Sequence, residues 1–252
     1  MTRLTNVCLE TASFRKTLEL FQAVCGLPPQ FPLHTDSQRV PAGRFQFRDC
    51  ELIVMQAEST RTGVTGITLA VPDLAARRQA LAENGIPAAE SVDRLQIQPD
   101  AASGIRVTLV GKVGASSLPA HGTARLDHLA LRVRDLTSAS QRWTAITGVR
   151  ADPMGIHPVS GGAFTAARFL LGERMIELIA PVTGVPSAIA GRLASHGEGP
   201  AALALPVDDL ERVLAKLRDL PARVLFRDPH WMVHPGDSGG ILLQLTPRVE
   251  HH

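Results

Sequence analysis

Two side chains in the second half of this sequence could each take part in acid–base chemistry. His128 lies in residues 125–136, where polar and apolar residues alternate as they do in a half-buried strand. Glu177 interrupts the apolar run 175–179, and a carboxylate in such a run needs a polar or charged partner. An imidazole exchanges protons near neutral pH. The second half is therefore the predicted functional half.

The His128 strand opens one of several repeated units. Residues 71–74 match residues 207–210, and the match continues without a gap at an offset of 136 over about 45 residues. Residues 4–26 match residues 126–148 at an offset of 122. Each copy reads as a strand, an amphipathic helix and further strands. The repeats predict four strand–helix–strand–strand–strand modules.

The modules define the predicted domains. We expect an N-terminal domain at 1-112 (modules 1-60 and 61-112) and a C-terminal domain at 123-248 (modules 123-182 and 197-248). Residues 113-122, rich in small residues, are the predicted linker. Residues 249-252 resemble the remnant of an expression tag and are left out of the metal argument.

Composition limits the class of protein. The chain has 252 residues, 44% hydrophobic and 20% charged, and a net charge of +2. These values indicate a globular protein without the positive field that nucleic acid requires. An apolar run of membrane-spanning length and a signal segment are both missing, so we expect a cytoplasmic protein. The three cysteines predict reduced thiols, and tyrosine is absent.

Four motifs point to a family. They are residues 126–131, 175–181, 206–210 and 234–245. This pattern resembles the vicinal oxygen chelate superfamily, which includes glyoxalase I, methylmalonyl-CoA epimerase, bleomycin-resistance proteins and extradiol dioxygenases, and it is most similar to the epimerase and glyoxalase-like branches. The resemblance implies an α+β fold of tandem βαβββ modules in two domains. Their curled mixed sheets would form cups for a small molecule and, usually, a divalent metal.

The resemblance also implies ligand positions in the C-terminal cup. The family's four metal positions fall on His128, Glu177, Ala202 and Gln244. Ala202 stands where a histidine is usual, so the implied metal set is reduced to His128, Glu177 and Gln244. The ion would be zinc, manganese, nickel, cobalt or iron.

Three interpretations of this incomplete set stay open. The first is a metal-free pair in which Glu177 orients His128 as a general base. The second is a metal site completed by His157, His234 or the substrate, and the third is a purely structural pair. In the first domain the matching positions are Asn6, Ile53, Gly66 and Thr108, which cannot hold a transition metal tightly. That domain is predicted to be degenerate and structural, or to help shape the pocket.

Further residues are predicted around the cup. Arg168 falls near the position where epimerase-like relatives have a catalytic acid or base, but a guanidinium cannot take a proton at neutral pH. It could instead bind a carboxylate or an enolate oxygen. Trp231, His234, Gln244 and Ala202 are the predicted ligand-binding residues.

The leading functional prediction is a lyase or isomerase that transfers a proton next to a carbonyl, with His128, Glu177 and Arg168 as the catalytic residues. The alternative is a non-catalytic binding or sequestration protein of the bleomycin-resistance kind. Ala202, Gln244 and the lack of tyrosine argue against an extradiol dioxygenase. The predicted partner is a small molecule, with no nucleic acid and no membrane. The expected state is a monomer that is a pseudo-dimer of domains, or a homodimer.

Overall fold

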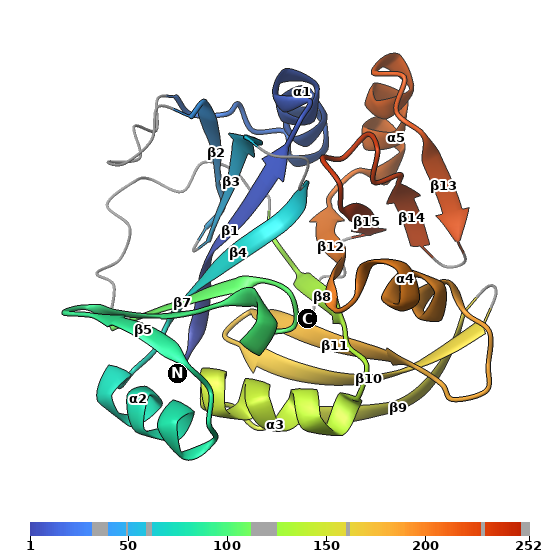
Figure 1. The fold of residues 1–252 in the computed structure, drawn as a ribbon. Helices are drawn as coiled ribbons and strands as arrows, with labels where there is room; N and C mark the ends of the chain where they lie inside the picture. Colours follow the sequence, from blue (N-terminus) through green and yellow to red (C-terminus); the bar gives the residue numbers. More distant parts are fainter. Residues whose placement is uncertain are drawn as a thin grey trace. The chain divides into compact units, whose positions relative to one another are not determined.

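The computed structural model describes residues 1–31, 40–48, 50–58, 62–111, 125–159, 162–227 and 230–247. The chain is drawn in Figure 1. The predicted linker at 113-122 and the segment 249-252 lie outside the described residues. In the part of the chain that is described, none of the helices is long and apolar enough to cross a membrane.

The first half of the chain contains the first two predicted helices. Its elements are β1 (Arg3–Thr11), α1 (Phe14–Cys25), β2 (Ala42–Gln46), β3 (Glu51–Gln56), β4 (Gly63–Ala70), α2 (Leu74–Glu83), β5 (Ala88–Ser91), β6 (Arg94–Ile97), a 3-10 turn (Pro99–Ala101) and β7 (Arg106–Val110). Helix α1 buries one apolar stripe and ends at Gly26, which has a φ of 67°. Helix α2 begins at Asp73, whose carboxylate accepts a hydrogen bond from the Ala76 N–H.

The second half repeats this pattern with one inserted helix. Its elements are β8 (His128–Arg132), α3 (Leu136–Thr147), β9 (Asp152–Val159), β10 (Gly162–Leu171), β11 (Arg174–Pro181), α4 (Ala188–His196), β12 (Gly199–Val207), α5 (Leu210–Asp219), β13 (Val224–Arg227), β14 (His230–Val233) and β15 (Leu242–Pro247). Sequence periodicity did not predict α4, β5, β9 or β13. The strands β5 and β13 are short, with mostly exposed side chains, and so lack an apolar alternation.

Each half of the chain builds one mixed sheet. The strand order is β2-β3-β1-β4-β7-β6-β5 in the first sheet and β13-β14-β15-β12-β8-β11-β10-β9 in the second. The first strand of a module pairs in parallel with its last, as β1 does with β3 and β8 with β11. The later strands of a module pair antiparallel. The predicted α+β class with curled, tandem βαβββ modules is confirmed.

Contacts divide the chain into two compact units that regroup the modules. Unit 1 holds Met1–Thr5, Gly66–Gly114 and His128–Ala201, and unit 2 holds Asn6–Thr65, Ala115–Asp127 and Ala202–His252. Helices α2 and α3 pack together in unit 1, and α1 and α5 pack together in unit 2. The second module is therefore grouped with the third, and the first with the fourth. The domain boundaries 1-112 and 123-248 follow the two sheets and stay a prediction.

Each unit has a helix-covered core on one face of its strands. In unit 1 the fully buried Trp143 of α3 packs on Phe169 of β10, with ring centroids 6.4 Å apart. In unit 2 Phe21 of α1 packs on Phe45 of β2, with centroids 6.0 Å apart. Because side chains alternate along a strand, the opposite faces are left to other residues, and these include the polar ones considered below.

One turn differs between the second and fourth modules in an informative way. Ser103 has a φ of 52°, a left-handed conformation that L residues rarely adopt, and Gly239 has the same conformation 136 residues later, with a φ of 77°. The Ser103 hydroxyl accepts a hydrogen bond from Trp143 Nε1 at 3.2 Å. A Cβ on Gly239 would lie 2.8 Å from a Leu9 methyl, which would have to shift, and the positive φ itself favours glycine there.

The inserted helix α4 belongs to unit 1. It begins at Ser187, whose side chain accepts from the Ala190 N–H, and Leu193 is its buried residue. Arg132 at the end of β8 donates from Nε to the carbonyl of Gly197, just past the helix, at 2.8 Å. Helix α4 packs on β11, and Figure 1 shows it on the side of that strand away from α3. It therefore lies on the side of β11 that α3 leaves uncovered.

Candidate functional site

Three adjacent strands of unit 1 bring the predicted catalytic side chains together. In the β10–β11 pair Arg168 lies opposite Glu177, and in the β11–β8 pair Glu177 lies opposite Ala130. His128 is two residues before Ala130 and so projects from the same face. All three side chains point away from the face that Trp143 and α3 cover.

The carboxylate of Glu177 is the centre of this cluster. Its Oε1 accepts a hydrogen bond from Arg168 Nε at 3.0 Å, and its Oε2 lies 4.0 Å from His128 Nε2. The side chains of His128 and Glu177 are 12% exposed, and that of Arg168 is 33% exposed. The predicted meeting of His128 and Glu177 is thus present, and Glu177 is also paired with a guanidinium. That pairing satisfies the carboxylate in its apolar strand.

The donors of unit 1 do not fit a transition-metal centre. Within the residues that the structure describes, no group of three or more His, Cys, Asp and Glu side chains is arranged to hold a metal ion. Glu177 is already bonded to Arg168, whose positive charge disfavours a cation beside it. The metal set of His128, Glu177 and Gln244 stays a prediction.

His157, proposed from sequence as an additional ligand, lies on another part of the sheet. It faces Phe164 across the β9–β10 pair, and the two rings stack with centroids 5.3 Å apart. Phe164 is four residues from Arg168 on β10, which corresponds to roughly 13 Å along the strand. His157 therefore does not join the Glu177 cluster in a common coordination shell.

The predicted ligand-binding residues of the fourth module lie in unit 2. Ala202 is buried on β12 and Gln244 is half-buried on β15, and both project from the same face. Trp231 lies opposite Leu245, whereas Gln244 lies opposite Met232, so Trp231 projects from the other face. The register thus separates Trp231 from Gln244 and Ala202, because a shift of one residue reverses the face.

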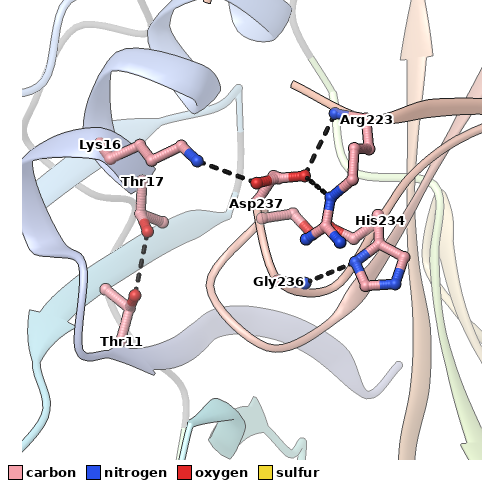
Figure 2. Close-up of polar contacts among 8 residues, drawn as sticks. Thr11, Lys16, Thr17, Arg223, His234, Gly236 and Asp237 are labelled. Carbon is pink, nitrogen blue, oxygen red and sulfur yellow. Dashed lines mark hydrogen bonds and ion pairs between the residues drawn. The ribbon is translucent and has the colours of Figure 1, made fainter. Parts of the chain in front are cut away.

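His234 belongs to a turn that an ionic cluster holds in place (Figure 2). Its Nδ1 accepts a hydrogen bond from the Gly236 N–H at 3.1 Å, and its carbonyl accepts from the Asp237 N–H. The buried carboxylate of Asp237 accepts from Lys16 Nζ at 2.9 Å and from Arg223 Nε at 2.7 Å. Burial alone would raise the pKa of Asp237, but these donors lower it well below its usual range. His234 is thus bonded within its own turn, and its role in ligand binding stays a prediction.

A second polar cluster, which sequence reasoning missed, lies on the three strands of the first module. Glu51 Oε2 accepts from Asn6 Nδ2 at 3.0 Å, and Glu51 Oε1 pairs with Arg44 Nη1 at 3.4 Å. Asn6 occupies the place that His128 has 122 residues later. The strand register makes Ile53 the counterpart of Glu177, but Glu51 projects from the same face two residues earlier. A search of the whole strand face for a carboxylate would have found it.

Comparison with known proteins matches one part of the chain to a family model and supports the fold. A family model described as a glyoxalase-like domain matches residues 126–232, which include the His128 cluster. No curated protein matches the chain.

Several solved structures have a similar fold. A variant of 4-hydroxymandelate synthase from Streptomyces coelicolor is 17% identical, with a TM-score of 0.67, covering 99% of this chain and 93% of that one. The 2,2',3-trihydroxybiphenyl 1,2-dioxygenase from Sphingomonas wittichii strain RW1 is 14% identical, with a TM-score of 0.66, covering 97% of this chain and 89% of that one. Methylmalonyl-CoA epimerase from Mycobacterium tuberculosis is 26% identical, covering 53% of this chain and 95% of that one, with a TM-score of 0.43.

Proposed function

We propose that this chain, a member of the vicinal oxygen chelate superfamily by its fold and its glyoxalase-like domain, catalyses proton transfer at a carbon next to a carbonyl. The reaction would be of the lyase or isomerase kind, on a small carbonyl or carboxylate metabolite. The observation that supports it is the arrangement of His128, Glu177 and Arg168 on one face of β8, β10 and β11.

In this proposal His128 is the general base. Its imidazole is largely shielded from solvent, and a carboxylate oxygen lies 4.0 Å from Nε2. When the imidazole accepts a proton from the substrate carbon, Glu177 is placed to stabilise the imidazolium that forms. Returning that proton to a different face or atom of the substrate completes an isomerisation.

Arg168 would bind the negative charge that develops on the substrate. Its Nε is bonded to Glu177, while a third of its side chain is exposed and can meet a ligand. An enolate or carboxylate oxygen is a suitable acceptor for a guanidinium. The Arg168–Glu177 pair is neutral overall, so the enolate and the imidazolium would balance each other.

One feature favours a second candidate, a binding protein without catalysis. Glu177 accepts a hydrogen bond from Arg168, whereas its distance to His128 is beyond hydrogen-bond length. A cluster held in this way recognises a polar ligand without any need to activate the imidazole. A function of the bleomycin-resistance kind requires only that a ligand be bound.

Isotope exchange tests the proposal. The full chain would be incubated in D₂O with a panel of 2-oxo acids, hydroxyketones and aldehydes, with and without a metal chelator. Loss of the proton signal at the carbon beside the carbonyl would be followed by NMR. We expect at least one compound to exchange about 10²–10⁴ times faster than in buffer, the range that one general base supplies.

The controls separate the candidates. The His128→Asn variant should lose the exchange, while His196→Asn, an exposed histidine on α4 of the same unit, should retain it. Exchange that is equal in wild type and His128→Asn would overturn the proposal. Saturable binding of a ligand that is recovered without deuterium would favour the binding protein, and sensitivity to the chelator would favour a metal.

A further inference from the structure

The cluster around Glu51 has the arrangement of the candidate site and occurs in the other compact unit. In both, a carboxylate on the last strand of a module is held by an arginine from the neighbouring hairpin strand and faces a polar residue on the first strand. The side chains of Arg44 and Glu51 are 21% and 14% exposed. This cluster lies on the face of β1, β2 and β3 that is turned away from Phe45 and α1.

Two buried polar atoms beside Glu51 have no hydrogen-bond partner within the described residues. One is Nε of Arg44, a donor, and the other is Oε1 of Gln46, an acceptor. Gln46 is 4% exposed and lies directly opposite Glu51 in the β2–β3 pair. Its Nε2 donates to the Phe47 carbonyl at 2.9 Å, which fixes the orientation of the amide and leaves Oε1 on the other side.

Such atoms need a partner. A buried donor or acceptor without one costs about 1–3 kcal/mol, and nearly all such groups in native proteins are bonded to protein, water or ligand. Here the missing partners are complementary: Arg44 needs an acceptor and Gln46 needs a donor. Arg44 and Glu51 cancel each other in charge, so the pair selects neither an anion nor a cation. A neutral group that offers an acceptor beside a donor would satisfy both atoms.

We propose that Asn6, Arg44, Gln46 and Glu51 form a second binding site, for a small neutral molecule with a hydroxyl next to a carbonyl. The carbonyl oxygen would accept from Arg44, and the hydroxyl would donate to Gln46. Asn6 stands where the other site has His128, and a carboxamide does not exchange protons near neutral pH. The site therefore binds without catalysing proton transfer. It lies in unit 2 and is independent of the proposed activity of unit 1.

Titration with hydroxyacetone tests this site directly. The ¹⁵N-labelled full chain would be monitored at the Arg44 Nε–H and at the side-chain amides of Asn6 and Gln46. We expect saturable shifts with a dissociation constant on the order of 1 mM. Acetone, which has the carbonyl but lacks the hydroxyl, should bind at least about tenfold more weakly, the effect of one lost hydrogen bond.

Variants make the result decisive. Gln46→Met keeps the size of the side chain but removes the acceptor, and it should weaken binding at least about tenfold, as loss of the hydroxyl does. Gln46→Leu is the second choice if that variant folds poorly. Gln96→Met, in the half-buried β6 position, is the matched control and should bind as wild type does. His128→Asn should also bind normally, which separates this result from the proposed function. Signals that do not move would overturn the proposal, and so would an affinity that is unchanged in Gln46→Met, because the ligand would then bind elsewhere.

Discussion

The two compact units have different polar side chains at comparable places in their modules. On the sheet face away from the helix, unit 1 has His128 beside Glu177, and unit 2 has Asn6 beside Glu51. Where a module's last turn meets a helix, unit 1 has the neutral hydrogen bond from Trp143 to Ser103. Unit 2 has the ionic cluster of Lys16, Asp237 and Arg223 at that place (Figure 2).

This comparison separates what the fold requires from what a reaction would require. Both units hold a carboxylate between an arginine and a first-strand polar residue, so that arrangement alone does not imply catalysis. Only unit 1 has an imidazole in it, and only an imidazole exchanges protons near neutral pH. The difference between His128 and Asn6 is therefore the most informative one to alter.

The largest expected effect comes from converting the site of unit 1 into that of unit 2. His128→Asn should lower the rate of deuterium exchange by about 10²–10⁴-fold, because the general base is removed. The unfolding midpoint should change little, since the carboxylate of Glu177 keeps its hydrogen bond from Arg168. The measurement is the NMR exchange rate with a parallel urea denaturation curve. An unchanged rate would show that His128 is not the base.

A smaller effect is expected when the charge between the imidazole and the guanidinium is removed. Glu177→Gln keeps the shape and can still accept from Arg168, but it no longer stabilises an imidazolium. We expect the exchange rate at saturating substrate to fall about 10- to 100-fold, a barrier increase of about 1.4–2.8 kcal/mol. Glu211→Gln, on α5, is the control. A change confined to KM would instead assign Glu177 to binding.

The ionic cluster of unit 2 predicts a pH-dependent stability. The lowered pKa of Asp237 means that its carboxylate stabilises the fold above pH 4, near its unfolded pKa of about 3.9, and loses this effect as the pH falls. Asp237→Asn should lower the free energy of unfolding at pH 7 by about 1–2 kcal/mol. The effect is no larger because Lys16 and Arg223 are half exposed and solvent screens their charges. Denaturation at pH 7 and pH 3 checks this.

The control for that experiment is Asp93→Asn, which removes an exposed ion pair with Arg94. It should leave the unfolding curve almost unchanged at either pH. If Asp237→Asn behaved in the same way, the cluster would contribute no more than an ordinary surface pair, and the contrast between the units would not extend to their stability.

The smallest expected effect is at the turn of unit 1. Trp143→Phe gives α3 the residue that α1 has at the equivalent position, Phe21, and it should cost about 1 kcal/mol through the lost hydrogen bond and packing volume. Adding Ser103→Gly should restore part of the lost stability, since unit 2 has Gly239 at the equivalent turn position. A double-mutant cycle of unfolding free energies measures the coupling between positions 143 and 103. Strictly additive effects of the two changes would contradict this prediction.

The fold could be predicted from the sequence because it is repeated. Ungapped offsets fix where strands and helices recur, and the alternation around His128 fixes its face. The proximity of His128 to Glu177 followed from the resemblance and is present in the structure. Glu51 was missed because the repeat pointed to Ile53, whereas a carboxylate two residues away on the same face can reach the same partner. Trp231 was placed with Gln244 although the register puts them on opposite faces.

The grouping of modules could not be predicted from the sequence in the same way. It depends on packing between helices that are far apart in the chain, such as α1 and α5, and local periodicity carries no information about such partners. The helix α4 was missed for a related reason. It is short, with a single buried residue, so its apolar stripe is weak.

Ser103 shows how repeated modules that pack in different units become unable to exchange parts. The buried indole of unit 1 donates to the hydroxyl of Ser103, whose backbone conformation is one that favours glycine. Unit 2, with the phenyl ring of Phe21 at the equivalent place, has Gly239 at the equivalent turn. A chimera that exchanged either helix without its matching turn would place a ring and a turn residue together that do not fit. The helix and the turn should therefore be exchanged together.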